Sequence, residues 1–166
     1  MKIVTLIFIA TFLFSCQKKA SQQENASNRS THLPATDPQD IPDSVALIFI
    51  NAYIENLEGE AIELTEWVDN NPLVTKTFRD ELHKLFDQET DLEGGGLDYD
   101  PILNAQDYPE EGFELKNMDA ATGYVTVAGK KWKEFKLKLK LIKTDKGWFV
   151  DGAGVINIPE GQRATQ

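Results

Sequence analysis

Four oxygen-bearing side chains crowd one stretch in the middle of this chain. Asp98, Asp100, Asn104 and Asp107 lie within ten residues of each other. Carboxylate and amide oxygens at such density could bind Ca²⁺, but the spacing lacks the Gly and the final Glu of the common twelve-residue calcium loop. The alternative is structural, because aspartates can accept hydrogen bonds from nearby backbone N–H groups and fix a loop. We favour this alternative, and the sequence predicts no metal and no cofactor.

The same stretch could instead supply acid–base chemistry. A desolvated aspartate, Asp98 or Asp107, would act as the base, and Tyr99 or Tyr108 would donate a hydrogen bond, provided that one cavity holds them. A Ser-His-Asp set is hard to assemble, because His83 is the one histidine of the folded part and is predicted to be exposed. We therefore treat the stretch as a candidate ligand or partner loop, the motif loop, made of Asp98, Tyr99, Asp100, Gln106, Asp107 and Tyr108.

The one cysteine, Cys16, directly follows a short apolar segment. Residues 3–14 are apolar apart from two threonines and follow Lys2. A membrane-spanning helix needs about 20 apolar residues, so this segment has the build of a secretory signal. Leu13-Phe14-Ser15-Cys16 resembles the lipobox of bacterial lipoproteins. We predict a signal peptide over residues 1–15 and acyl chains on Cys16; the alternative is an ordinary signal with a chance cysteine.

Residues 16–43 are predicted to be the lipidated cysteine and a disordered tether. After Cys16 this segment has no aromatic residue and holds three of the seven prolines. Such a composition cannot bury enough apolar surface to offset the ordering of the chain. Gln17 differs from the Asp of the inner-membrane retention signal, so we expect attachment to the outer membrane, facing the periplasm. Surface display stays open as an alternative.

Charge divides the remaining residues into an acidic and a basic part. Residues 44–119 hold nineteen acidic and four basic residues, whereas residues 120–166 hold four acidic and nine basic ones. The candidate basic surface is Lys136, Lys138 and Lys140, which alternate with leucines. It is either a solvated strand face, which we favour, or a docking surface for an acidic partner or anionic lipid headgroups. The net charge of −10 argues against nucleic acid.

The first half of the folded part is predicted to be helical. A helix is predicted from Asp43 or Ser44 to about residue 57, apolar almost all round and therefore deeply buried. A shorter helical segment is expected over residues 61–68. Asn71-Pro72 is interpreted as the cap and first-turn proline of the next helix. That helix should end before Gly94-Gly95-Gly96, which is interpreted as a C-cap and hinge and not as a phosphate-binding loop.

The second half is predicted to form antiparallel strands. Strands are predicted near residues 113–117, 123–127, 133–143 and 147–158, with a hairpin turn over residues 144–147. Apolar and polar residues alternate in the third of these segments, which indicates one buried and one wet face. Helices followed by strands favour an α+β fold, with N-terminal helices on a curved antiparallel sheet of about four strands. Residues 44–166 should form one such domain.

Several short motifs resemble an uncharacterised bacterial family, a domain of unknown function whose members are often secreted or lipid-anchored. The resemblance covers roughly Ser44 to Pro159 and carries no activity. The layout is also similar to the cone-shaped, cystatin-like fold of nuclear transport factor two and ketosteroid isomerase, in which a long helix closes a bent sheet over a pocket. The motifs are Asn71-Pro72-Leu73-Val74-Thr75, Asp98-Tyr99-Asp100-Pro101-Ile102, Gln106-Asp107-Tyr108-Pro109 and Gly147-Trp148-Phe149-Val150-Asp151.

Together these patterns predict a lipid-anchored protein of the cell envelope that binds a protein partner or a small ligand without catalysis. The alternative is an enzyme or ligand carrier with a ketosteroid-isomerase-like pocket. A buried Asp98 or Asp107 beside a tyrosine hydroxyl would favour the alternative. Carboxylates bonded to backbone in a loop that is packed shut would favour the binding module.

Overall fold

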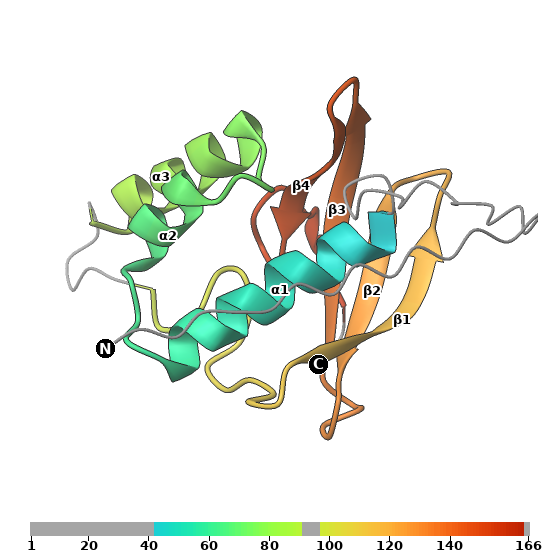
Figure 1. Ribbon diagram of the computed structural model, residues 1–166. Helices are drawn as coiled ribbons and strands as arrows, with labels where there is room; N and C mark the ends of the chain where they lie inside the picture. Colours follow the sequence, from blue (N-terminus) through green and yellow to red (C-terminus); the bar gives the residue numbers. More distant parts are fainter. Residues whose placement is uncertain (1–41, 91–96, 165–166) are drawn as a thin grey trace, which may run out of the picture. The chain divides into compact units, whose positions relative to one another are not determined.

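The computed structural model describes residues 42–90 and 97–164 (Figure 1). The chain divides into two units, Met1–Pro34 and Ala35–Gln166, and every described residue belongs to the second. The predicted signal peptide, Cys16, nearly all of the tether and Gly94-Gly95-Gly96 lie outside the described residues. Of the described helices, none combines the length and apolarity needed to cross a bilayer.

Three helices open the described part: α1 (Pro42–Glu58), α2 (Leu64–Asn70) and α3 (Lys76–Thr90). Helix α1 lies across the strands of the sheet (Figure 1). Its buried residues recur at one-turn spacing, which turns a single face toward the sheet. Ile48, on the other face, is 46% exposed, so the prediction of a helix buried all round is wrong. The buried residues are Val45, Ala46, Phe49, Ile50, Tyr53 and Ile54.

Four antiparallel strands form one open sheet in the order β1-β2-β3-β4. They are β1 (Phe113–Asp119), β2 (Tyr124–Gly129), β3 (Lys136–Thr144) and β4 (Gly147–Ala153). In β3 the leucines are buried and the lysines between them are half-buried, as the alternation predicts. The α+β prediction, with helices packed on an antiparallel sheet, is therefore confirmed.

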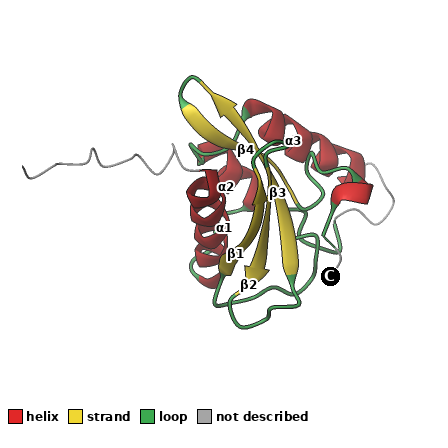
Figure 2. Cartoon of the chain, turned by 90° about the vertical axis from the view of Figure 1, so that its right-hand side faces the viewer, coloured by secondary structure: helices red, strands yellow, loops and turns green. Residues whose placement is uncertain are grey.

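The core lies between α1 and the sheet and extends to α2 and α3. Figure 2 shows α1 running along one face of the strands. Phe49 packs against Trp67 and Phe78, with ring centroids 5.5 and 5.8 Å away. Tyr53 lies 5.0 Å from the same Trp67 ring. This aromatic cluster joins all three helices, and the apolar side chains of the sheet complete it.

The helix after Asn71-Pro72 begins later than the sequence predicts. Residues 73–75 run alongside β4, where Leu73 O accepts from Val150 N at 2.8 Å and Thr75 N donates to Val150 O at 3.0 Å. These bonds hold the segment extended, so α3 starts at Lys76. Its cap is Thr75, whose hydroxyl accepts from Phe78 N at 3.0 Å. Asn71 instead closes a short turn by accepting from Leu73 N at 2.9 Å.

The last strand ends earlier than predicted. Strand β4 stops at Ala153, and Gly154 (φ +58°) and Asn157 (φ +54°) turn the chain back. A short 3₁₀ helix, η2 (Glu160–Gln162), follows. The chain after β4 covers Gly152 from the face opposite the helices, because a Cβ there would lie 2.8 Å from Ile156 O. The end of the described chain thus lies on the outer face of the sheet.

Candidate functional site

Asp100 is the anchor of the motif loop. Its Oδ1 accepts from the backbone N–H groups of Ile102 and Leu103, both at 2.8 Å. Its Oδ2 accepts a short hydrogen bond from the hydroxyl of Tyr53, which is 1% exposed and comes from α1. The backbone of Asp100 also bonds to Ala105 and Asn104. Both carboxylate oxygens therefore have partners within the protein.

Burial changes the acidity of both side chains in this pair. Desolvation raises the pKa of Asp100, and the hydrogen bonds from Tyr53, Leu103 and Ile102 partly oppose that rise. Desolvation also raises the pKa of Tyr53 above its ordinary 10.0, and the neighbouring Asp100 carboxylate adds to the shift. The Tyr53 hydroxyl thus stays protonated and donates a hydrogen bond to the Asp100 carboxylate. The pair holds the loop, and neither oxygen of Asp100 is left to act on a substrate.

The turn after β4 closes the loop from the other side. Val155 N donates to Pro101 O at 3.0 Å. A Cβ on Gly154 would lie 2.3 Å from Pro101 O and 2.4 Å from Ile102 O, so a glycine is required at this contact. The segment from Asp100 to Leu103 is therefore packed shut between α1 and the end of β4.

The structure does not bring the six residues of the motif loop into one cavity. Tyr108 donates to Glu58 Oε1 at 2.8 Å, and this hydrogen bond is the main cause that raises the pKa of its hydroxyl. Tyr99 is half-buried, whereas Asp98 and Asp107 are exposed. Gln106, also exposed, donates to Asp98 O at 2.9 Å. The arrangement expected of an acid–base site, a buried Asp98 or Asp107 beside a tyrosine hydroxyl, is therefore absent.

A second surface feature groups two of these residues with a tryptophan. Gln106 and Asp107 line a hollow of about 270 Å³ together with Ala105, Trp132 and Phe135, which we call the Trp132 cleft. Trp132 is 44% exposed. The lining of the cleft is therefore both polar and aromatic.

In residues 42–90 and 97–164 there is no group of three or more His, Cys, Asp or Glu side chains that could hold a metal ion.

The three predicted lysines lie on the sheet face that the helices leave uncovered. The register places Lys138 opposite Thr126 and Lys140 opposite Tyr124, with Lys136 further along β3. The ammonium groups of Lys138 and Lys140 lie 5.6 and 4.5 Å from the centroid of the Tyr124 ring. We call these five residues the lysine face. Lys140 also donates to Thr122 O.

A groove runs along the lysine face. It has a volume of about 350 Å³ and contains one carboxylate, Asp119, whose Oδ1 accepts from Ala121 N and Thr122 N. Hydrogen bonds from Thr122 and Ala121 lower the pKa of Asp119. Gln162 of η2 forms part of the groove wall. The lining residues are Asn117, Asp119, Thr122, Tyr124, Thr126, Lys138 and Gln162.

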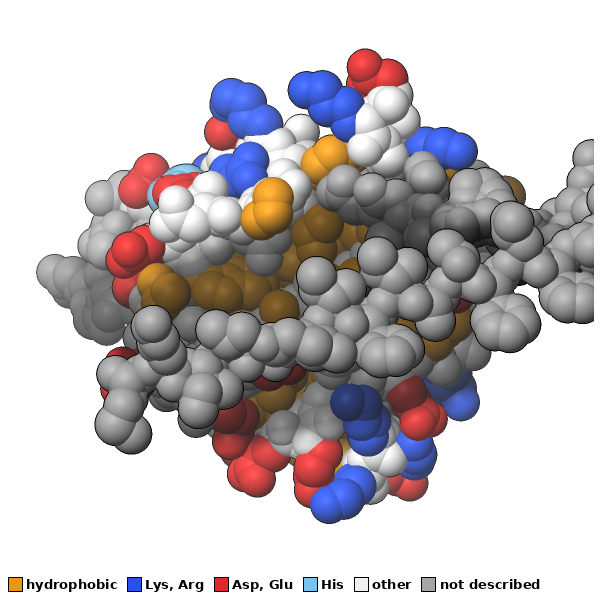
Figure 3. All heavy atoms as spheres, in the orientation of Figure 1, with side chains coloured by type: hydrophobic (Ala, Val, Ile, Leu, Met, Phe, Trp, Pro, Cys, Tyr) orange, Lys and Arg blue, Asp and Glu red, His pale blue; other side chains and the backbone are white. Residues whose placement is uncertain are grey.

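Among the described residues, no ion pair includes a lysine of the lysine face. Lys131 pairs with Glu111 and Lys133 with Glu114, both at 2.7 Å, but within the described residues Lys136, Lys138 and Lys140 have no carboxylate within ion-pair distance. Viewed from the α1 side, acidic side chains lie at the left and along the lower edge of the surface, with lysines and arginines among them (Figure 3). The ion pairs of Lys131 and Lys133 join the basic part of the sequence to the acidic part, so the charges are only partly separated in space.

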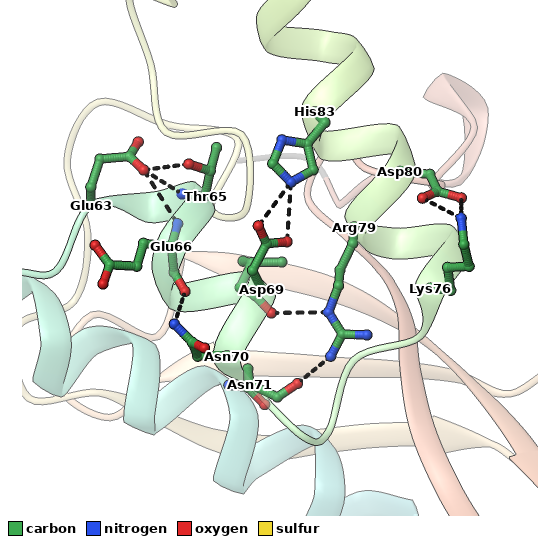
Figure 4. A network of polar contacts seen from close by, with 11 residues as sticks. Glu63, Thr65, Glu66, Asp69, Asn70, Asn71, Lys76, Arg79, Asp80 and His83 are labelled. Atoms are coloured by element: carbon green, nitrogen blue, oxygen red, sulfur yellow. Dashed lines mark hydrogen bonds and ion pairs between the residues drawn. The ribbon is translucent and has the colours of Figure 1, made fainter.

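A polar network that sequence reasoning did not find joins α2 to α3 (Figure 4). Arg79 donates to Val68 O at 3.3 Å and to Asn71 O at 2.6 Å, and it thereby satisfies carbonyls at the end of α2. His83 lies 3.0 Å from Asp69. Its side chain is 47% exposed, as predicted, and among the described residues it bonds to no hydroxyl or thiol. The network therefore fastens two helices.

Comparison with known proteins gives no match: no family model, no curated protein and no solved structure matches the chain significantly. The resemblance of the motifs to an uncharacterised bacterial family, and of the layout to the cone-shaped fold, therefore stays a prediction. What the chain does has to be inferred from its own surfaces.

Proposed function

We propose that this chain is a lipid-anchored, non-catalytic protein of the bacterial envelope, and that its lysine face binds an acidic segment of a protein partner. The anchor is Cys16 in the segment Leu13-Phe14-Ser15-Cys16, and the predicted destination is the periplasmic side of the outer membrane. The single observation that carries the binding role is the lysine face itself. Three half-buried lysines, which have no ion-pair partner among the described residues, lie on the uncovered side of the sheet, and one of them, Lys138, lines a groove there.

Electrostatics supports an acidic partner. Partly desolvated ammonium groups interact more strongly with an incoming carboxylate than fully solvated ones do. Like charges gathered on one surface also steer an oppositely charged partner and raise its association rate. The cation–π contacts to Tyr124 hold Lys138 and Lys140 over the sheet, which lowers the entropy lost on binding.

The form of the surface supports a protein segment over a lipid surface. Lys138 lines a groove together with residues of β1, β2 and η2, and an extended peptide can enter such a groove. A bilayer presents a plane and meets protruding charges more readily than recessed ones. The non-catalytic role is supported by Asp100, because Tyr53 and two backbone N–H groups already occupy its oxygens.

The ketosteroid-isomerase-like alternative has less support. It requires a base and a donor in one cavity. Asp98 and Asp107 are exposed, and the Tyr108 hydroxyl donates to Glu58. We therefore do not propose an enzymatic role.

The binding role is tested with poly-L-glutamate as the probe. We expect saturable binding that weakens as salt rises, and the double charge reversal Lys138→Glu/Lys140→Glu should weaken it at least about tenfold. The matched control is Lys143→Glu/Lys146→Glu, which changes the net charge equally but leaves all residues of the lysine face unchanged. Equal losses in both variants would contradict the proposal. So would tighter binding to phosphatidylglycerol vesicles than to poly-L-glutamate.

The anchor is tested in the producing bacterium. The mature protein should incorporate a radiolabelled fatty acid and sediment with membranes, and Cys16→Ser should abolish both. The second signal is the mass of the mature N-terminus, which should equal that of a chain beginning at acylated Cys16. A free thiol at Cys16 in membrane-bound protein would contradict lipid attachment.

A further inference from the structure

A second surface of the molecule has the chemistry of a sugar-binding site. The Trp132 cleft combines a large exposed aromatic ring with a carboxylate, Asp107, and an amide, Gln106. Its residues are separate from the lysine face.

The indole of Trp132 is held in place by its surroundings. Its ring packs edge-on against Phe135 at a centroid distance of 5.1 Å, and Phe135 is buried. The turn that carries Trp132 is closed by hydrogen bonds from Phe135 N to Trp132 O and from Gly129 N to Phe135 O, both at 3.1 Å. Gly129 packs so closely on Pro109 that a Cβ would lie 2.6 Å from the proline ring. A ligand would thus meet a preformed aromatic surface, which reduces the entropy cost of binding.

The other two tryptophans provide the contrast. Trp67 and Trp148 are partly buried against the hydrophobic core, where their burial stabilises the fold. Trp132 lies at the surface in contact with Phe135, and much of its ring faces solvent. Exposed tryptophans in fixed positions are typical of binding surfaces, because the ring offers a large apolar area and an N–H donor.

The polar groups of the cleft are mainly acceptors. Within the described residues, the Asp107 carboxylate has no hydrogen bond or ion pair. Gln106 uses its Nε2 to bond Asp98 O, so its side-chain oxygen can accept from a ligand. The ligand must therefore bring hydroxyl or amide donors to one side of an apolar face.

The charge of the cleft excludes acidic ligands. Among the residues that the structure describes, no lysine or arginine lines it. The nearest basic residues in sequence, Lys131 and Lys133, are paired with Glu111 and Glu114. A carboxylate or phosphate would meet Asp107 without a compensating cation, which costs binding energy.

We propose that the Trp132 cleft binds a neutral glycan, with one sugar ring stacked on Trp132 and its hydroxyl groups donating to Asp107 and Gln106. A pyranose ring has one face of C–H groups that packs on an aromatic ring, and a rim of hydroxyl donors. The hollow of about 270 Å³ accepts one ring and leaves the rest of an oligosaccharide in solvent.

Calorimetric titration of the purified full chain with three tetrasaccharides, chitotetraose, cellotetraose and maltotetraose, tests this. At least one should bind saturably. Trp132→Ala should weaken that binding at least about tenfold, Asp107→Asn by several fold, and Trp132→Phe less than Trp132→Ala. The thermal midpoint of each variant is measured first. It should equal that of the parent, because Trp132 and Asp107 lie at the surface.

The matched control is Lys138→Glu/Lys140→Glu, which should leave glycan binding unchanged. Absence of saturable binding to all three tetrasaccharides and to an array of neutral glycans would overturn the proposal. Binding that survives Trp132→Ala would overturn it as well. Because the two sites share no residue, either proposal can fail without the other.

Discussion

At the scale of single residues, the Tyr53–Asp100 pair is the most constrained polar contact of the motif loop. Forty-seven positions separate the two residues in sequence, and their hydrogen bond joins α1 to the loop. The half-buried Asp100 carboxylate would lose a partner of its Oδ2 without this donor, at a cost of about 1–3 kcal/mol. The pair therefore stabilises the fold. Because the pKa of Tyr53 is raised in the folded protein, this stabilisation should depend on pH.

Stability at alkaline pH should report on Tyr53. Its pKa is raised in the folded protein, so above pH 10 the unfolded chain releases this proton while the folded protein retains it. The contribution of Tyr53 is complete below pH 10 and is lost as pH rises further, by up to about 1.4 kcal/mol per pH unit. The unfolding free energy is measured by urea titration between about pH 9 and about pH 11.5. It should fall less steeply with rising pH in Tyr53→Phe than in the parent, because the variant lacks this ionisable group.

Tyr108→Phe is the matched control for that experiment. Tyr108 also donates to a carboxylate, Glu58, but it is only half-buried, so solvent screens the interaction. Its removal should change the alkaline slope less than Tyr53→Phe does. An unchanged slope in Tyr53→Phe would show that Tyr53 is not responsible.

Gly154 should tolerate no side chain. The residue has φ +58°, and a Cβ would overlap the carbonyl oxygens of Pro101 and Ile102. Gly154→Ala should lower the unfolding free energy by about 2–4 kcal/mol, through backbone strain and displacement of the loop. Gly161→Ala, where nothing lies within 4 Å of the added carbon, should change it by less than about 0.5 kcal/mol. Similar urea midpoints for the two variants would contradict this account.

At the scale of secondary-structure elements, β4 organises the contacts of the helices. It pairs with β3 on one side, and on the other it pairs with Val74 through an isolated parallel bridge. Asp151 stands at the irregularity in the β3–β4 register and accepts from the Thr75 hydroxyl at 2.7 Å. Thr75 thus caps α3 and joins it to β4 through one oxygen.

Thr75→Ala should therefore cost more than its small change in volume suggests. It removes the cap of α3 and a hydrogen bond to Asp151, for an expected loss of about 1–2 kcal/mol in unfolding free energy. Thr75→Ser keeps the hydroxyl and should lose less than about 0.5 kcal/mol. Urea unfolding of both variants tests this, and an equal loss in Thr75→Ser would assign the effect to the methyl group instead.

At the scale of the whole molecule, the described core is self-contained. The buried apolar side chains of residues 42–90 and 97–164 run from Val45 to Ile158, all within the unit Ala35–Gln166. A chain that begins at Ala35 should then unfold with a thermal midpoint within about 2 °C of that of the full chain. Differential scanning calorimetry measures this, and a midpoint lower by more than about 5 °C would show that residues 1–34 add to stability.

Acidic and basic residues are unevenly distributed over the whole molecule. Residues 44–119 hold nineteen acidic and four basic residues, whereas residues 120–166 hold four acidic and nine basic ones. A cluster of like charges orients a molecule as it approaches an oppositely charged partner. This supports a binding role in which the lysine face meets the partner first.

Local patterns in the sequence were sufficient for the fold class. Alternating leucines and lysines predicted β3 because a strand repeats every two residues, and Gly147 marked its hairpin because the turn needs a positive φ. The first helix and the first three strands were predicted to within a few residues, whereas β4 ends at Ala153 and not near residue 158. The resemblance of Leu13-Phe14-Ser15-Cys16 to a lipobox is likewise a local pattern, and the lipidation of Cys16 stays a prediction.

The tertiary structure alone decided what the motif residues do. Tyr53 is far from Asp100 in sequence, but its hydroxyl donates a hydrogen bond to the Asp100 carboxylate. Val74 pairs with Val150 and is extended, although Asn71-Pro72 predicted the start of a helix there. The same packing separates Asp107 from Tyr108 and sets it beside Trp132. Each outcome depends on which distant residue supplies a hydrogen bond or excludes water, and spacing along the chain carries no information about such partners.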